Sequence, residues 1–409
     1  MILVNEIKLK EAIFNFMISH LKNSGSFWLT SFRPFFLLGS LYSIILIFLW
    51  LMLLSGKITF SIRASSIDWH AYEMVYGFLR AILVGFLFTA GQNWTGKIIL
   101  RGNSLLALTS CWIFGRLSFH PNFEISALSS CFDILFDIVV VYLLYKFLYT
   151  ESQIRNHIIV HCYFLFTFFH FLAGISILNL ISTSYILHFV HLSIFVLILF
   201  LFIIAGRILP FFTIAQVPGA TLSNFPILEK LLYPLCYSFI FSELLIVWFY
   251  SVKYVSAILG FTLFITNVIR LYRWKSWISW KYPILFVLHL GYLWLSIGFL
   301  AFGLYRLGYL PASPVYHIFT IGGLSLFIYG MITRIPLGHT GLKIKASLAT
   351  QIAYLLLNVA FFIRVIFPLF HLTREAYFYS GILWIISFFL YLIQFTSILI
   401  SPRIDGKIG

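Results

Sequence analysis

The chain has 409 residues, of which 61% are hydrophobic and only 10% are Asp, Glu, Lys or Arg. Soluble domains average about 45–50% apolar and about 25% charged residues, so this composition excludes a soluble protein. The formal net charge of +15 is spread over short loops, which argues against nucleic acid as a partner because such a partner needs one concentrated basic surface. The lipid bilayer is therefore the first partner that the sequence implies.

The elements follow in chain order. Residues 1–31 are predicted to form a basic amphipathic segment on the membrane surface, with Lys8, Lys10 and Lys22 beside apolar residues. Residues 32–401 are predicted to form one transmembrane domain, because crossing a bilayer takes about 20 apolar residues per helix. Residues 402–409 form a short tail. Twelve spans are predicted, near 32–56, 68–90, 104–120, 124–148, 157–178, 184–209, 227–251, 254–272, 282–305, 313–333, 346–371 and 376–401.

The fold class is thus an all-α, polytopic membrane helix bundle, and its orientation follows from the basic residues. Nineteen of the 27 Lys and Arg residues lie in the two tails and the even-numbered loops, whereas five lie in the odd-numbered loops. Because cytoplasmic loops carry the excess of basic residues, both termini are predicted to be cytoplasmic. The expected location is the inner (cytoplasmic) membrane of a bacterium.

This orientation places several histidines toward the outer face. His188 and His191 stand three residues apart, so they share a helical face and could share one metal ion, with His170 as a third ligand from a neighbouring helix. Imidazole suits copper, zinc, iron or nickel. The alternative for each histidine alone is an interfacial residue that bonds a backbone carbonyl.

His70 and His317 each begin a span from the outer side, so they could clamp a haem iron from opposite faces if the two spans are neighbours. Arg116, near the outer end of the third span, is the candidate cation for the haem propionates. The four cysteines form no C-x-x-C-H motif, so covalent haem attachment is not expected and the haem would be of the b type. In haem-copper oxidases, whose large subunit also has twelve helices, the haem and copper histidines lie on spans 2, 6, 7 and 10. Here spans 2, 6 and 10 carry histidines, whereas the seventh span has none.

Carboxylates within the spans need a cation, a proton or water. Glu73 follows His70 by one helical turn, and Asp133 and Asp137 share a face of the fourth span, with Arg80 and Arg116 as candidate countercharges. One interpretation is proton delivery to a buried redox centre. The other is a set of static ion pairs that fixes helix register.

Several long motifs resemble the NnrS family of bacterial membrane proteins. They are FRPFFLLG from Phe32, DWHAYEMVYGF from Asp68, QNWTGK from Gln92, GRILPFFT from Gly206, VLHLGYLWLSIG from Val287, and HIFTIGG from His317 running on to TRIPLGHTG from Thr333. The resemblance covers residues 32–341 and implies haem and copper as cofactors and a link to nitric oxide metabolism, denitrification and nitrosative stress. It adds His289 to the candidate cofactor-binding residues.

The expected activity is that of a nitric oxide reductase-like oxidoreductase, in which Glu73 and Tyr72 are the candidate catalytic residues and a quinol or another donor supplies electrons. Tyr72 replaces the second histidine that the family usually has in this motif. Two alternatives remain open. One is a non-catalytic haem protein that senses nitric oxide or protects iron pools, and the other is a secondary transporter with twelve helices.

Overall fold

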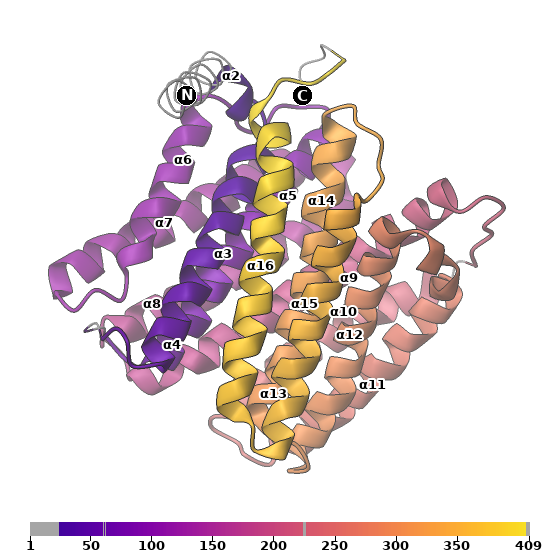
Figure 1. Ribbon diagram of the computed structural model, residues 1–409. Helices are drawn as coiled ribbons and strands as arrows, with labels where there is room; N and C mark the ends of the chain where they lie inside the picture. The colour runs from indigo at the N-terminus through magenta and orange to yellow at the C-terminus, as the bar shows by residue number, and fades with distance from the viewer. Residues whose placement is uncertain (1–23, 60, 62, 224–225, 406–409) are drawn as a thin grey trace, which may run out of the picture.

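A computed structural model describes residues 24–59, 61, 63–223 and 226–405 of the chain. Most of the surface segment predicted over 1–31, and the end of the tail predicted over 402–409, lie outside these residues. Within the described part every regular element is helical, and the helices assemble into one bundle (Figure 1). The all-α prediction is confirmed.

The helices comprise α-helices of 4 to 31 residues, two π-helical segments (η1 and η6) and short 3-10 turns. In chain order they are α2 (Ser24–Phe27), α3 (Phe32–Leu54), α4 (Ser66–Tyr72), η1 (Glu73–Leu79), α5 (Arg80–Thr95), α6 (Asn103–Phe114), η2 (Gly115–Leu117), α7 (Phe123–Leu148), η3 (Glu151–Asn156), α8 (His157–Ile177), η4 (Thr183–Tyr185), α9 (Ile186–Gln216), α10 (Pro226–Leu245), α11 (Val252–Arg273), η5 (Ser276–Lys281), α12 (Pro283–Arg306), α13 (Ala312–His317), η6 (Ile318–Ser325), α14 (Leu326–His339), α15 (Leu348–Ile366), η7 (Phe367–Phe370) and α16 (Thr373–Ile400).

Ten helical runs in the described residues are long and apolar enough to cross a membrane, against the twelve spans expected. The two remaining predicted spans correspond to α6 and α10, which are helices but do not meet these requirements for length and polarity. α6 has 12 residues and spans only about 18 Å at 1.5 Å per residue, short of the roughly 30 Å hydrocarbon core. α10 carries Glu229, Lys230 and Glu243 within its 20 residues. The haem-copper-oxidase-like arrangement stays a prediction.

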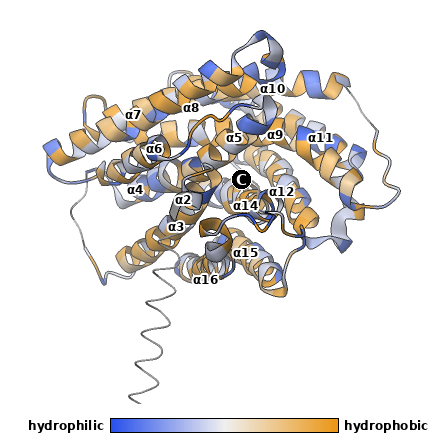
Figure 2. Ribbon diagram, turned by 90° about the horizontal axis from the view of Figure 1, so that it is seen from above, coloured by the Kyte–Doolittle hydropathy of each residue, from blue (hydrophilic) through white to orange (hydrophobic). Residues whose placement is uncertain are grey.

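The three runs that carry the outer histidines are the most buried of the ten. Their most apolar windows are 78% buried in Ser66–Thr95, 89% in Thr183–Gln216 and 78% in Ala312–His339, against 33% in Thr373–Ile400. These three runs therefore form the centre of the bundle, and α3, α11, α15 and α16 surround them. The surrounding helices are largely hydrophobic (Figure 2). They expose large apolar side chains such as Phe48, Leu355 and Phe389, as contact with lipid requires.

Two of the central runs change to π-helix directly after a histidine. η1 begins three residues after His70, and η6 begins one residue after His317. A π-helical turn holds one more residue than an α-helical turn, so it rotates the side chains that follow, and such turns are frequent at functional sites. α4 and α13, which precede them, lie at the end of the bundle opposite to α2 and the C-terminal end of α16 (Figure 1).

Candidate functional site

A cavity of about 310 Å³ lies between the central helices at the α4–α13 end. This volume falls at the lower end of the roughly 300–1,000 Å³ of small-molecule sites. α3, α4, η1, α9, α13, η6, α15 and α16 all contribute to its wall, most of which is apolar. Its polar side chains include three imidazoles and one guanidinium group, those of His70, His191, His317 and Arg364. We call this the histidine cavity.

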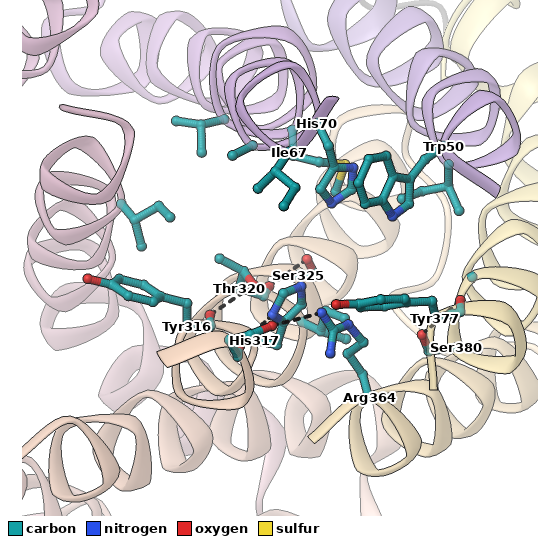
Figure 3. Close-up of a pocket in the computed structure, with 18 of the residues that line it drawn as sticks. Trp50, Ile67, His70, Tyr316, His317, Thr320, Ser325, Arg364, Tyr377 and Ser380 are labelled. Carbon is teal, nitrogen blue, oxygen red and sulfur yellow. Dashed lines mark hydrogen bonds between the residues drawn. The ribbon is translucent and has the colours of Figure 1, made fainter. Parts of the chain in front are cut away.

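His70 and His317 reach the cavity from opposite walls (Figure 3). The His70 ring stacks on the Trp50 indole, with ring centroids 4.5 Å apart and planes 17° apart. Its Nδ1 atom is buried and has no hydrogen-bond partner among the described residues. A buried polar atom without a partner costs free energy, so this nitrogen is available to a ligand in the cavity.

The His317 ring is oriented by its own helix. Its Nδ1 atom lies 2.6 Å from the Ser313 carbonyl oxygen, and a carbonyl only accepts, so Nδ1 carries the proton and donates it. The lone pair is then on Nε2. Histidines that bind metals commonly donate their other ring N–H to a carbonyl in this way, so His317 has the tautomer that a metal ligand needs.

His191 lies against Tyr316, with ring centroids 3.6 Å apart and planes 11° apart. His188, one turn earlier on α9, does not line the cavity, and its buried Nε2 lacks a partner among the described residues. Among all the residues that the structure describes, no three side chains of His, Cys, Asp or Glu come together to hold a metal ion. The structure does not bring His170 to this pair, because His170 belongs to a separate network.

Arg364 is the cation that sequence reasoning missed at this site. It is 6% exposed, and its Nη2 atom donates a hydrogen bond to Ser313 Oγ at 3.0 Å, while Nη1 lacks a partner among the described residues. Its guanidinium group lies 4.3 Å from the centre of the Tyr377 ring. The sequence signal was only that Arg364 is one of three arginines within predicted spans, and nothing local distinguished it from Arg80 and Arg116.

Arg116 is used elsewhere. It forms ion pairs with Glu73 and Asp133 and does not line the histidine cavity. Arg80 likewise pairs with Asp133 and, at 3.1 Å, with Asp137. Arg116 was expected to face a haem propionate, but it does not lie at the cavity. Two carboxylates of the bundle already neutralise its charge.

Tyr72 and His170 complete this buried network. Tyr72 donates a hydrogen bond to Asp133 at 2.9 Å, and its hydroxyl lies 2.7 Å from His170 Nε2. His170 Nδ1 lies 2.5 Å from Asp137, which also accepts a 2.8 Å hydrogen bond from Tyr163. Tyr72 and Glu73 thus point away from the cavity that His70 lines, although all three belong to one helical run.

His289 lies apart from all of these residues. Its Nε2 is 3.1 Å from Thr213 Oγ1 and its Nδ1 is 2.8 Å from Ser276 Oγ, so both ring nitrogens are engaged. Thr213 is 22 residues after His191 on α9, about 33 Å along the helix at 1.5 Å per residue. His289 therefore cannot contact a molecule in the histidine cavity.

Comparison with known proteins gives one result that covers almost the whole chain. No curated protein matches it. The family model described as NnrS protein matches residues 26–403, which include every helix of the site. This chain therefore belongs to the NnrS family.

Proposed function

We propose that this protein binds haem b in the histidine cavity and acts on nitric oxide there. The observation that carries the proposal is the pair His70 and His317 on opposite walls of one cavity, with Arg364 unpaired beside them. Membership of the NnrS family supports it, because that family is associated with haem and metal binding and with nitric oxide-related processes.

The residues fit the group by their chemistry. His70 would hold the iron through Nδ1, which has no hydrogen-bond partner among the described residues. His317 would hold it through Nε2, which carries the lone pair because Nδ1 donates to the Ser313 carbonyl. Arg364 would pair with a propionate. Most of the remaining wall is apolar or aromatic, as a porphyrin needs, with a few Ser and Thr side chains among these residues. When bound, the haem would supply an iron that exchanges single electrons, and nitric oxide would have to replace one of the two imidazoles to bind that iron. A copper ion fits less well, because no three His, Cys, Asp or Glu side chains among the described residues come together to hold a metal ion.

A second step, reduction of nitric oxide to nitrous oxide, is favoured by Glu73, a buried carboxylate three residues after His70 on the same helical run, although its side chain does not line the cavity. The reaction joins two nitric oxide molecules and consumes two protons and two electrons, giving nitrous oxide and water. Glu73 is fully buried, and its Oε1 atom has no hydrogen-bond partner among the described residues. A free carboxylate oxygen can take up and release a proton, so Glu73 is the residue that we assign to proton supply, with a quinol or another donor supplying electrons.

The test is a haem spectrum of the purified full chain, with and without nitric oxide. We expect a Soret band that shifts with nitric oxide in the wild type and in a His161→Ala control, in which an exposed histidine of α8 is removed. The double variant His70→Ala, His317→Ala should lose the band. Full haem content in the double variant would refute the ligands, and a wild type without haem would favour the transporter alternative.

Nitrous oxide production separates the remaining alternatives. With a chemical reductant and nitric oxide, gas chromatography should detect nitrous oxide from the wild type and much less from Glu73→Gln at equal haem content. A haem-loaded wild type that binds nitric oxide but forms no nitrous oxide would instead favour a sensor or protective protein.

A further inference from the structure

A second, smaller cavity of about 60 Å³ adjoins the histidine cavity along the axis of the bundle. Leu79, at the end of η1, lines both cavities. The other two central runs also continue from one cavity wall to the next. On α9, Ile194 lines the histidine cavity and Leu197 lines the second cavity. On η6, Ser325 lines the histidine cavity and Leu324 lines the second. One side chain, Leu79, therefore stands where the two spaces meet.

The same three central runs form most of both walls. The residues of each run recur at three- and four-residue intervals, so each run turns one continuous face toward the axis. The second cavity lies between α5, α9 and α14, with Phe36 of α3 also in its wall, and it is only partly enclosed by protein. The histidine cavity and the second cavity thus form consecutive parts of one axial space.

The chemistry of the second cavity is uniform. Its wall consists only of Phe, Leu, Ile and Met side chains. The volume is several times the roughly 10–15 Å³ that a water molecule needs, but apolar cavities of this kind stay dry and take up small apolar molecules such as xenon. An ion or a polar solute would lose its hydration there without any compensating hydrogen bond.

We propose that the second cavity is a binding site for a small uncharged gas molecule, and that Leu79 separates this site from the histidine cavity. Nitric oxide has this chemistry, since it is diatomic, uncharged and weakly polar. A molecule held here lies one side chain away from the cavity that contains the imidazoles. The gas site itself depends only on the wall, whereas its service to a haem rests on the proposed function.

Xenon tests the site without any cofactor. Crystals of the detergent-purified full chain are pressurised with xenon, and anomalous scattering locates the bound atoms. We expect xenon between α5, α9 and α14 in the wild type. Leu83→Phe should abolish this peak, because Leu83 lines the cavity and is only partly covered by protein. Ile328→Phe, which enters from the opposing α14, repeats the test if the first variant does not fold.

The matched control is Leu355→Phe, because Leu355 lies on the lipid-facing side of α15 and is 61% exposed. It should keep the xenon peak. A wild-type crystal without xenon at this position would overturn the proposal, as would a peak that survives both filling variants.

A second measurement addresses the connection through Leu79. After flash photolysis of carbon monoxide from the reduced haem protein, Leu79→Ala should change the fraction that rebinds before escaping, because it opens the second cavity to the first. An unchanged fraction would contradict the connection. If the purified protein contains no haem, the proposed function is refuted but the xenon result still stands. If the protein contains haem but no xenon binds, the gas site is refuted and the proposed function stands.

Discussion

At the scale of single residues, the three arginines within the predicted spans, Arg80, Arg116 and Arg364, differ in their partners. Arg80 forms ion pairs with Asp133 and Asp137, and Arg116 forms ion pairs with Glu73 and Asp133. Arg364 has no ion pair with a carboxylate among the described residues; it keeps one hydrogen bond to Ser313 and the face of Tyr377. Burying a charge without an opposite charge is costly, so an unpaired arginine in a cavity wall marks a place for an anionic ligand.

Arg364→Gln should therefore act with opposite signs on two measured quantities. In haem-free protein the variant should be at least as stable as the wild type, because it removes a buried, unpaired charge. With haem, it should weaken binding by about 1.5–3 kcal/mol, the range of a hydrogen bond to a charged group. Thermal unfolding and haem titration measure the two effects, with the exposed Arg374→Gln as the control. Unchanged haem affinity would exclude contact with a propionate.

Asp133 is the carboxylate on which the buried network depends most. It pairs with both Arg80 and Arg116 and accepts the hydrogen bond of Tyr72. Asp133→Asn should destabilise the folded protein by about 3–5 kcal/mol, because removing one partner leaves buried charges uncompensated. Thermal unfolding in detergent measures this loss.

Tyr72→Phe should cost less, about 1–3 kcal/mol, since it removes one hydroxyl and leaves the ion pairs in place. The exposed Glu151→Gln provides the control for both variants and should leave the unfolding temperature almost unchanged. An Asp133→Asn protein as stable as this control would show that the network does not hold α5, η2 and α7 together.

At the scale of elements, the sequence predicted the positions of the helices better than their internal geometry. Apolar run lengths located ten of the twelve expected spans, because hydropathy alone determines where a helix can lie in lipid. The π-helical segments η1 and η6 could not be predicted, since one extra residue in a turn leaves an apolar run looking the same. The contacts of Arg364 with Ser313 and Tyr377 could not be predicted either, because they depend on which helices become neighbours.

Close helix contact at η6 depends on Gly323. A Cβ atom at this position would lie 2.2 Å from Leu295 Cδ2 of α12. Gly323→Ala should destabilise the protein by about 1–3 kcal/mol through overpacking, and the additional change Leu295→Ala should recover part of the loss measured for Gly323→Ala. Thermal unfolding of the two single variants and the double variant gives the coupling. Gly338→Ala, whose added Cβ would meet its nearest neighbour at an ordinary 3.5 Å, is the control.

At the scale of the whole molecule, the positions of the predicted site residues follow from the alternation of spans. His70, His191 and His317 share one cavity, as their common depth requires. His339 lies at the other end, where its carbonyl accepts a hydrogen bond from Arg403 at 2.6 Å. The sequence could predict which end each histidine occupies, but not which spans are adjacent. His170 therefore was expected beside His188 and His191, yet it lies among the carboxylates of α7.

The distribution of basic residues predicts that the end with α2 and the C-terminal end of α16 faces the cytoplasm. The histidine cavity would then lie toward the outer face of the membrane. Lys57 and Lys343 are exposed and follow α3 and α14 at opposite ends of the bundle. In a variant whose four cysteines are changed to alanine, intact spheroplasts should allow an impermeant maleimide to label Lys57→Cys but not Lys343→Cys. Lysis should make both positions reactive. Labelling of Lys343→Cys alone in intact cells would show the opposite orientation and place the cavity on the cytoplasmic side. The two loops lie on opposite sides of the membrane because an odd number of spans separates them.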